Sequence, residues 1–182
     1  MWQSYLRWRH SHGFGVHSPY AYQLVTTVIR PGDYGYYGYD RIDRLFLSPK
    51  HESGNKLRKD LYLLLRLIVN ADVKRLIVFP EMQSYYKTVA KCAGISCETY
   101  ISGKEKKYGQ GDLLCISGEF SDCQAMESIE SNNVAVIAFD PSKELREILE
   151  QPKERGLLFT GKRIIIRIPR KEMAFAAYSM KF

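Results

Sequence analysis

The chain has 182 residues, of which 45% are hydrophobic and 26% are charged. This composition is typical of a globular protein and excludes a chain that is disordered throughout. The formal net charge of +7 is unevenly distributed: it is +6 over residues 1–75, −5 over residues 76–152 and +6 over residues 153–182. The two basic ends can attract a polyanion, although a net charge of this size is also ordinary for the solubility of a domain.

The sequence predicts neither a membrane span nor a signal peptide. The longest strongly apolar stretch, Leu61–Asn70, contains Arg66 and is far shorter than the roughly 20 residues that a membrane-spanning helix needs. The segment Met1–Tyr5 lacks the basic-then-apolar order of a signal peptide. We therefore expect a cytoplasmic protein that does not insert into a membrane.

The four cysteines, Cys92, Cys97, Cys115 and Cys123, form no CxxC pair. Structural zinc sites are usually built from such pairs, so no zinc site is predicted. In a cytoplasmic protein we expect reduced thiols that are mostly buried.

Helices are predicted in the first part of the chain. Ser18 followed by Pro19 is typical of a helix start, because serine caps the first turn and proline fits the first helical position. This helix is expected to end at Pro31, and a short helix is expected over Asp40–Leu47. Between Leu57 and Ile68, apolar residues recur at helical spacing, which predicts an amphipathic helix.

From residue 71 onwards, short apolar runs alternate with helical segments. Continuous apolar runs of this length are typical of strands buried on both faces. The predicted strands are Leu76–Phe79, Cys97–Ile101, Leu113–Ile116, Val134–Phe139, Arg163–Ile168 and Met173–Phe182. The predicted helices are Ser84–Ala93, Asp122–Ser131 and Ser142–Glu150. Residues 169–172 are expected to join the last two strands as a β-hairpin.

The alternation of strands and helices predicts an α/β fold: a mostly parallel sheet with helices on both faces and a C-terminal antiparallel β-hairpin. Residues 1–70 are expected to form an N-terminal helical cap or extension. Residues 71–182 are expected to form the sheet domain.

One motif resembles a known family. The stretch HGFGVHSP contains His12, Gly13, Gly15, His17, Ser18 and Pro19. It is similar to the opening of class I S-adenosylmethionine-dependent methyltransferase-like proteins of the type common in Bacteroidetes. Val136–Asp140 resembles the fifth strand of that family, which typically ends in one or two aspartates, and Arg163–Phe182 resembles its final hairpin. The resemblance implies a Rossmann-like methyltransferase scaffold and, in active members, S-adenosylmethionine as the cofactor.

The cofactor-binding motifs of that family are degenerate in this chain. Active members carry a glycine-rich turn after the first strand, because the backbone there must approach the cofactor closely. Here Pro80–Ser84 follows the first strand, and no glycine occurs between Gly54 and Gly94. Two adjacent tyrosines, Tyr85 and Tyr86, lie near the position expected for the cofactor.

Two further departures concern the second and third strands. Glu98 lies inside the second strand rather than at its end, where active members place an acid for the ribose, and Lys104 has the wrong charge for that role. The segment Ser102–Gly111 is shorter than the dozen or more residues of a β–α–β crossover, so one crossover is expected to be deleted. The third strand ends in Ser117 and Glu119, where relatives often have an aspartate.

These departures favour a diverged, non-catalytic methyltransferase-like protein with a binding or assembly role. Two alternatives remain: an active methyltransferase that binds S-adenosylmethionine in an altered pose, and a nucleic-acid-binding module. The crevice at the carboxyl ends of the strands is the default pocket. Its candidate cofactor-binding residues are Pro80, Glu81, Gln83, Ser84, Ser117, Glu119 and Asp140. Glu119 and Asp140 are either an acid and base pair or solvated loop residues, and no catalytic residue is assigned.

The N-terminal residues and one sheet edge suggest other partners. His10, His12 and His17 have a spacing that a metal site can use, but we expect His12 and His17 to bond to the backbone, and no metal is predicted. A set of cationic and aromatic side chains can either stack bases and bind phosphates or pack on the sheet domain; it comprises Arg7, Arg9, Arg30, Trp2, Tyr5, Trp8 and Tyr20.

The Tyr34–Tyr39 segment is either a lid or a turn. With one strand deleted, Cys97–Ile101 becomes a sheet edge, which suggests a homodimer or another partner at that edge.

Overall fold

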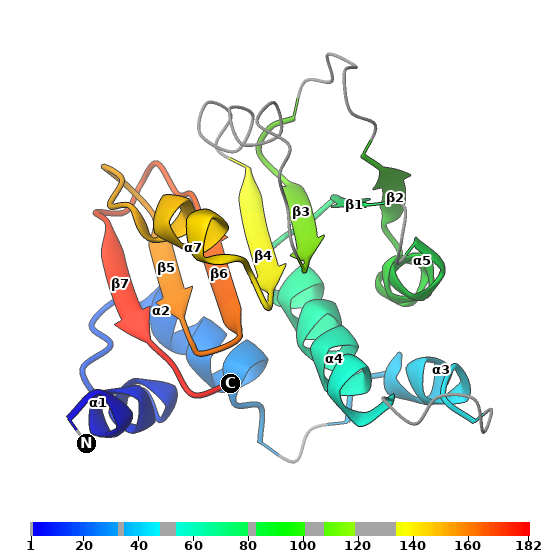
Figure 1. Cartoon of the computed structure of the whole chain (residues 1–182), viewed down its shortest axis with the longest axis horizontal. Helices are drawn as coiled ribbons and strands as arrows, with labels where there is room; N and C mark the ends of the chain where they lie inside the picture. The colour runs from blue at the N-terminus through cyan, green and yellow to red at the C-terminus, as the bar shows by residue number, and fades with distance from the viewer. Residues whose placement is uncertain (1, 33–34, 48–53, 80–82, 101–107, 119–133) are drawn as a thin grey trace.

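A single mixed β-sheet organises the chain in the computed structural model, which describes residues 2–32, 35–47, 54–79, 83–100, 108–118 and 134–182. Within these residues, seven strands lie in the order β2-β1-β3-β4-β6-β5-β7 (Figure 1). Their bounds are Arg75–Val78 for β1, Ser96–Thr99 for β2, Asp112–Ser117 for β3, Ala135–Phe139 for β4, Leu157–Thr160 for β5, Ile164–Ile168 for β6 and Ala176–Ser179 for β7. Strand β6 runs antiparallel to β4 and β5, and the other neighbouring strands are parallel. The predicted α/β fold with a mostly parallel sheet is confirmed.

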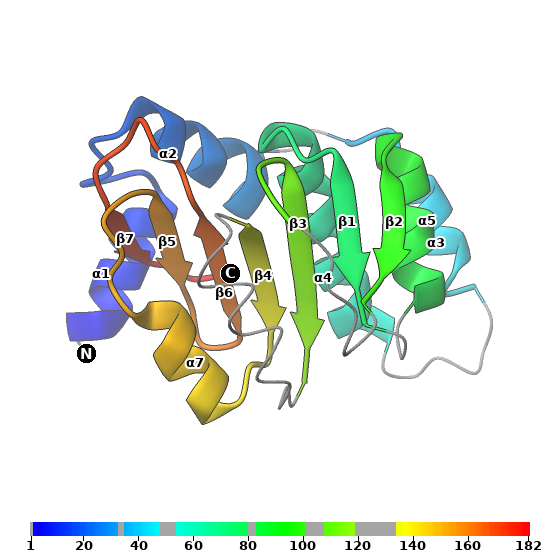
Figure 2. The same ribbon diagram turned by 90° about the horizontal axis from the view of Figure 1, so that it is seen from above.

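Helices cover both faces of the sheet (Figure 2). They are α1 (Trp2–Ser11), α2 (Pro19–Leu24), the π-helical segment η1 (Val25–Ile29), α3 (Tyr39–Arg44), α4 (Gly54–Asn70), α5 (Gln83–Ala93) and α7 (Lys143–Glu150). The apolar residues of α2, η1, α4 and α5 join the core on one face, and Leu145 and Leu149 of α7 join the core on the other. Figure 1 shows α1 beside β7, on the same face as α2 and α4.

The central strands β3, β4 and β6 are mostly apolar because both of their faces are covered. In β3, Leu113 and Cys115 belong to the core under α4, whereas Leu114 and Ile116 belong to the core under α7. Successive side chains of a strand point to opposite faces, so a strand buried on both sides shows a continuous apolar run rather than alternation. This is the pattern that predicted the central strands from the sequence.

Helix α4 packs the predicted apolar stripe against the sheet. Leu61, Leu64, Leu65 and Ile68 are each at most 2% exposed. Complete burial of such a side chain contributes about 1.5–3 kcal/mol relative to leaving it in water. Burial of its apolar face therefore holds α4 against the sheet.

The predicted start of α2 is confirmed. The hydroxyl oxygen of Ser18 accepts a hydrogen bond from the backbone N–H of Ala21 at 3.2 Å, and Pro19 opens the helix. Before it, Gly13 and Gly15 have φ angles of +82° and +79°, a backbone conformation that residues with a Cβ rarely adopt. The glycines of the opening motif thus shape the loop between α1 and α2.

The predicted C-terminal hairpin is wrong. Strand β6 does not pair with β7, because β5 lies between them: β5 pairs antiparallel with β6 and parallel with β7. Residues 157–160 were not predicted as a strand, although they form a short apolar run between Gly156 and Gly161. The chain turns tightly after β5, where the N–H of Gly161 donates to the carbonyl of Ile164 at 2.8 Å. The hairpin therefore lies one strand earlier than expected.

The remaining predictions differ in detail or stay open. The short helix expected over 40–47 is α3 and ends at Arg44. The helix expected over Asp122–Ser131 lies outside the described residues, as does most of Ser102–Gly111. Strand β2 is at the edge of the described sheet. The division into a cap at 1–70 and a sheet domain at 71–182 stays a prediction.

Candidate functional site

The carboxyl ends of the parallel strands bring two of the candidate residues together. Ser117 ends β3, and Asp140 follows the last residue of β4. Ser117 pairs in register with Phe139, whose carbonyl accepts a hydrogen bond from Gly118 N–H at 3.1 Å. Ser84 lies exposed in the first turn of α5. Pro80, Glu81, Glu119 and the side chain of Gln83 lie outside the described residues.

An ion cluster that the sequence did not predict surrounds Asp140. Arg163, which precedes β6, bridges two carboxylates: its Nη2 lies 2.8 Å from Oδ2 of Asp60 on α4, and its Nε lies 3.1 Å from Oδ1 of Asp140. The Nζ of Lys56 lies 2.9 Å from Oδ2 of Asp140. We call Lys56, Asp60, Asp140 and Arg163 the carboxyl-edge cluster. The sequence offered one hint of this cluster: Asp60 is a charged residue that directly precedes Leu61 of the apolar stripe of α4.

The two carboxylates of this cluster have opposite pKa shifts. Burial raises the pKa of Asp60 above its usual value, and the bond from Arg163 offsets this only in part. Burial also acts to raise the pKa of Asp140, but hydrogen bonds from Lys56 and Arg163 outweigh it and lower the pKa. Asp140 also has a φ of +48°, so the chain turns sharply where β4 ends. The cations of the cluster thus neutralise both carboxylates.

Tyr86 occupies the space next to Ser117. Its side chain is 3% exposed and lies next to the side chains of Ser117 and Cys115. Burial raises the pKa of the Tyr86 phenol and raises that of the Cys115 thiol to about 12. The neighbouring Tyr85 stacks on Phe46, with ring centroids 6.1 Å apart. Aromatic side chains therefore fill this part of the strand ends.

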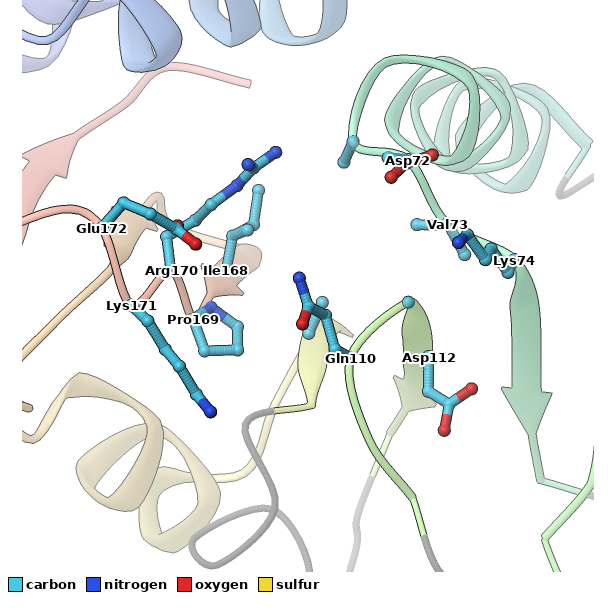
Figure 3. Close-up of a pocket in the computed structure, with 13 residues that line it drawn as sticks. Asp72, Val73, Lys74, Gln110, Asp112, Ile168, Pro169, Arg170, Lys171 and Glu172 are labelled. Atoms are coloured by element: carbon cyan, nitrogen blue, oxygen red, sulfur yellow. The ribbon is translucent and has the colours of Figure 1, made fainter.

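Two of the pockets on the described surface bear on this site. One, of about 210 Å³, lies beside α4 and is lined by Asp60 and Arg163 together with apolar residues that include Leu63 and Phe182. The other, of about 500 Å³, lies at the opposite edge of the sheet, where Gln110 faces Pro169 and Arg170 (Figure 3). Neither of these two pockets is lined by Ser84, Ser117 or Asp140.

The larger pocket mixes charges of both signs. Lys74, Arg170 and Lys171 line it together with Asp72, Asp112 and Glu172. Both oxygens of Asp112 are already bound by Arg75, at 2.8 and 2.6 Å. The lining thus shows no preference for an anion or a cation.

The three N-terminal histidines lie in different surroundings. The ring of His10 meets that of Tyr178 edge-on, with centroids 5.7 Å apart. The Nδ1–H of His12 donates to the carbonyl of Trp8 at 2.7 Å, and its Nε2 accepts from Nη1 of Arg30 at 2.6 Å. His17 is exposed. In the described part of the chain, no group of three His, Cys, Asp or Glu side chains is placed to hold a metal ion.

The tyrosine-rich segment packs against the protein at two points. The hydroxyl of Tyr36 donates to the carbonyl of Thr27 at 3.1 Å, and Tyr39 stacks on Tyr62 with ring centroids 4.0 Å apart. Tyr37 is 88% exposed, and Tyr34 lies outside the described residues.

Among the helices described, none is both long and apolar enough to cross a membrane.

Comparisons with known proteins give no relative. No family model matches the chain, and neither the search of curated proteins nor the search of solved structures found a match.

Proposed function

We propose that this protein is a diverged methyltransferase-like scaffold with a binding or assembly role, and that it does not transfer methyl groups. Support comes from the opening motif, from the parallel block β2-β1-β3-β4 and from the antiparallel strand β6 that follows it. Fold alone does not imply function, so the proposal depends on the residues at the carboxyl ends of the parallel strands.

The single observation that carries the proposal is the burial of Tyr86 against Ser117. In open α/β sheets, ligands bind outside the carboxyl ends of the strands. A nucleoside beside β1 and β3 would have to displace a side chain that is 3% exposed. Exposing a buried aromatic ring costs about 1.5–3 kcal/mol, and that cost would be subtracted from the binding free energy.

The carboxyl-edge cluster supports the same conclusion. A general base must reach a proton on the substrate and have a pKa near the working pH. Asp140 fits this role poorly, because its pKa is lowered and it is bound by two cations. The pKa of Asp60 is raised, but its carboxylate is paired with Arg163. We therefore propose that the cluster ties α4 to the β4–β6 region.

The test is a thermal shift combined with calorimetry, using S-adenosylmethionine and S-adenosylhomocysteine up to millimolar concentration. A ligand at about 100 times its Kd adds about 2.7 kcal/mol of stability, which corresponds to roughly 5–10 °C for a chain of this length. We expect no shift and no saturable heat. A saturable signal in the wild type that weakens in Asp140→Asn would contradict the proposal and favour an active methyltransferase with an altered cofactor pose.

For the assembly role we propose a homodimer through β2. This strand has one neighbour, β1, in the described sheet, and an edge strand can pair with the same strand of a second copy. Light scattering after size exclusion should show a dimer, and a monomer at about 100 µM, far above an ordinary dissociation constant for a stable pair, would refute it.

A further inference from the structure

Exposed aromatic rings line the outer side of α1 and the loop that follows it. Tyr5, Trp8 and Phe14 are 49%, 45% and 56% exposed. The ring centroids of Tyr5 and Trp8, and those of Trp8 and Phe14, are 6.2 Å apart, with interplanar angles of 21° and 22°. The ring of His12 lies 4.7 Å from that of Trp8. We call Tyr5, Trp8, His12 and Phe14 the α1 aromatic row.

The opposite side of α1 is what holds the helix to the protein. Ser11 is 1% exposed, and its hydroxyl donates to the carbonyl of Arg7 at 2.6 Å and accepts from the N–H of Lys181 at 2.7 Å. His10 packs edge-on against Tyr178 of β7. The row is therefore carried on an anchored helix. About half of the surface of Tyr5 and of Trp8 stays accessible, so neither ring is a buried packing residue.

Cations flank the row, and the surrounding elements carry no acidic side chain. The guanidinium carbon of Arg9 lies 5.9 Å from the ring centroid of Tyr5, and Arg30 donates to His12. Neither residues 1–32 nor residues 173–182 contain Asp or Glu. Because α1 packs on η1 and β7, the row lies in a region of uniformly positive side-chain charge, which favours a polyanionic partner.

We propose that the α1 aromatic row binds single-stranded nucleic acid, with bases stacked on its rings and phosphates paired with Arg9 and Arg30. Rings combined with cations bind single strands because every unpaired base offers a face for stacking. A duplex keeps its bases stacked on one another and leaves the rings unused. A helix that lies on a membrane is strongly amphipathic and buries a face of aromatic and aliphatic side chains. Helix α1 is only weakly amphipathic, and its one aliphatic residue, Leu6, is half-buried.

The inference is independent of the proposal about S-adenosylmethionine. The α1 aromatic row shares no residue with the carboxyl-edge cluster, and it names a partner for the binding role. Loss of either proposal leaves the other intact, since one is tested with a small ligand and the other with an oligonucleotide.

The test is fluorescence anisotropy of labelled oligo-U and oligo-dT of about 15 nucleotides, a length within the usual site sizes of such surfaces. The full chain should bind both strands, and affinity should fall steeply with salt. Trp8→Leu combined with Phe14→Ala should weaken binding about 10- to 100-fold, which corresponds to one or two lost base stacks. Arg9→Gln with Arg30→Gln should reduce the salt slope by about 1 for each lost phosphate contact.

The matched control is Tyr37→Ala, which removes a ring that is 88% exposed and lies outside the row; it should leave affinity unchanged. Circular dichroism establishes that each variant is folded. If Trp8→Leu fails to fold, Phe14→Ala alone, in the loop, serves as the test.

Three outcomes would overturn the proposal. The first is duplex binding as tight as single-strand binding. The second is full affinity after removal of the rings, which would mean attraction by charge alone. The third is cosedimentation with vesicles of phosphatidylcholine and phosphatidylserine without oligonucleotide binding, which would identify the row as a membrane contact.

Discussion

Replacement of Arg163 by methionine should destabilise the protein, because it leaves the buried carboxylate of Asp60 without its cation. The side chain of Asp60 is 10% exposed, whereas those of Arg163 and Asp140 are 38% and 42% exposed. Removing one partner of a fully buried ion pair costs about 3–5 kcal/mol, and exposed pairs contribute about 0–1 kcal/mol. Because Arg163 is partly solvated, we expect Arg163→Met to cost about 2–3 kcal/mol at neutral pH.

The destabilisation should depend on pH with a defined sign. In the wild type, burial already raises the pKa of Asp60, and Arg163 acts to lower it. Without Arg163 the pKa rises further, so folding then favours the protonated carboxyl. The deficit of the variant should therefore be largest near neutral pH and should shrink as the pH falls and Asp60 becomes protonated in the folded variant.

Urea unfolding followed by circular dichroism measures this free energy at each pH. The double variant Asp60→Asn, Arg163→Met should recover part of the loss, since it removes the unpaired charge. Lys143→Met is the control, because its 3.9 Å pair with Glu147 is largely exposed, and it should change stability by less than about 0.5 kcal/mol. The reasoning is refuted if Arg163→Met falls within about 0.5 kcal/mol of the wild type, a change typical of an exposed pair, or if its deficit does not vary with pH.

Three further predictions test the fold. Ser18→Ala removes the cap of α2 and should cost about 1 kcal/mol in urea unfolding; an unchanged midpoint would mean that the hydroxyl does not cap the helix. In Gly156→Ala, at φ +111°, the added Cβ would lie 2.5 Å from the carbonyl oxygen of Ile168, so we expect a loss of more than about 1 kcal/mol, whereas Gly35→Ala, which meets nothing within 4 Å, should be near neutral. Cys115, 1% exposed and with its pKa raised to about 12 by burial, should resist iodoacetamide at pH 8 until the protein is unfolded, as measured by peptide mass spectrometry; labelling as fast as that of half-buried Cys97 would contradict its position in the core.

Local patterns predicted most of the elements correctly. The apolar stripe of α4, the cap at Ser18 and the continuous apolar runs of β1, β3 and β4 are signals that lie within a few residues of one another. Residues 157–160 form a short, mostly apolar run like those of the other strands, but no strand was predicted there. This strand, β5, lies between β6 and β7, so the hairpin is formed by β5 and β6 rather than by β6 and β7. Local patterns do not predict this, because strand order in a sheet depends on pairing between distant segments.

The candidate site was only partly predictable. Asp140 and Ser117 were expected at the carboxyl edge because parallel strands end on one side of a sheet. Arg163 and Asp60 were not expected there, since they are separated by 103 positions in the chain. Nothing in the sequence pairs these two charges.

The amino-acid sequence by itself determined the α/β class, the positions of most helices and strands, and the basic, acid-free character of the first 30 residues, because these depend on composition and local spacing. Only the tertiary structure decided which side of α1 is anchored, that Tyr5 and Trp8 stay exposed, and that Tyr86 is buried beside Ser117. The local sequence around an aromatic residue is the same whether its ring is buried in a core or exposed to a partner. Contacts between segments distant in the chain decide between the two.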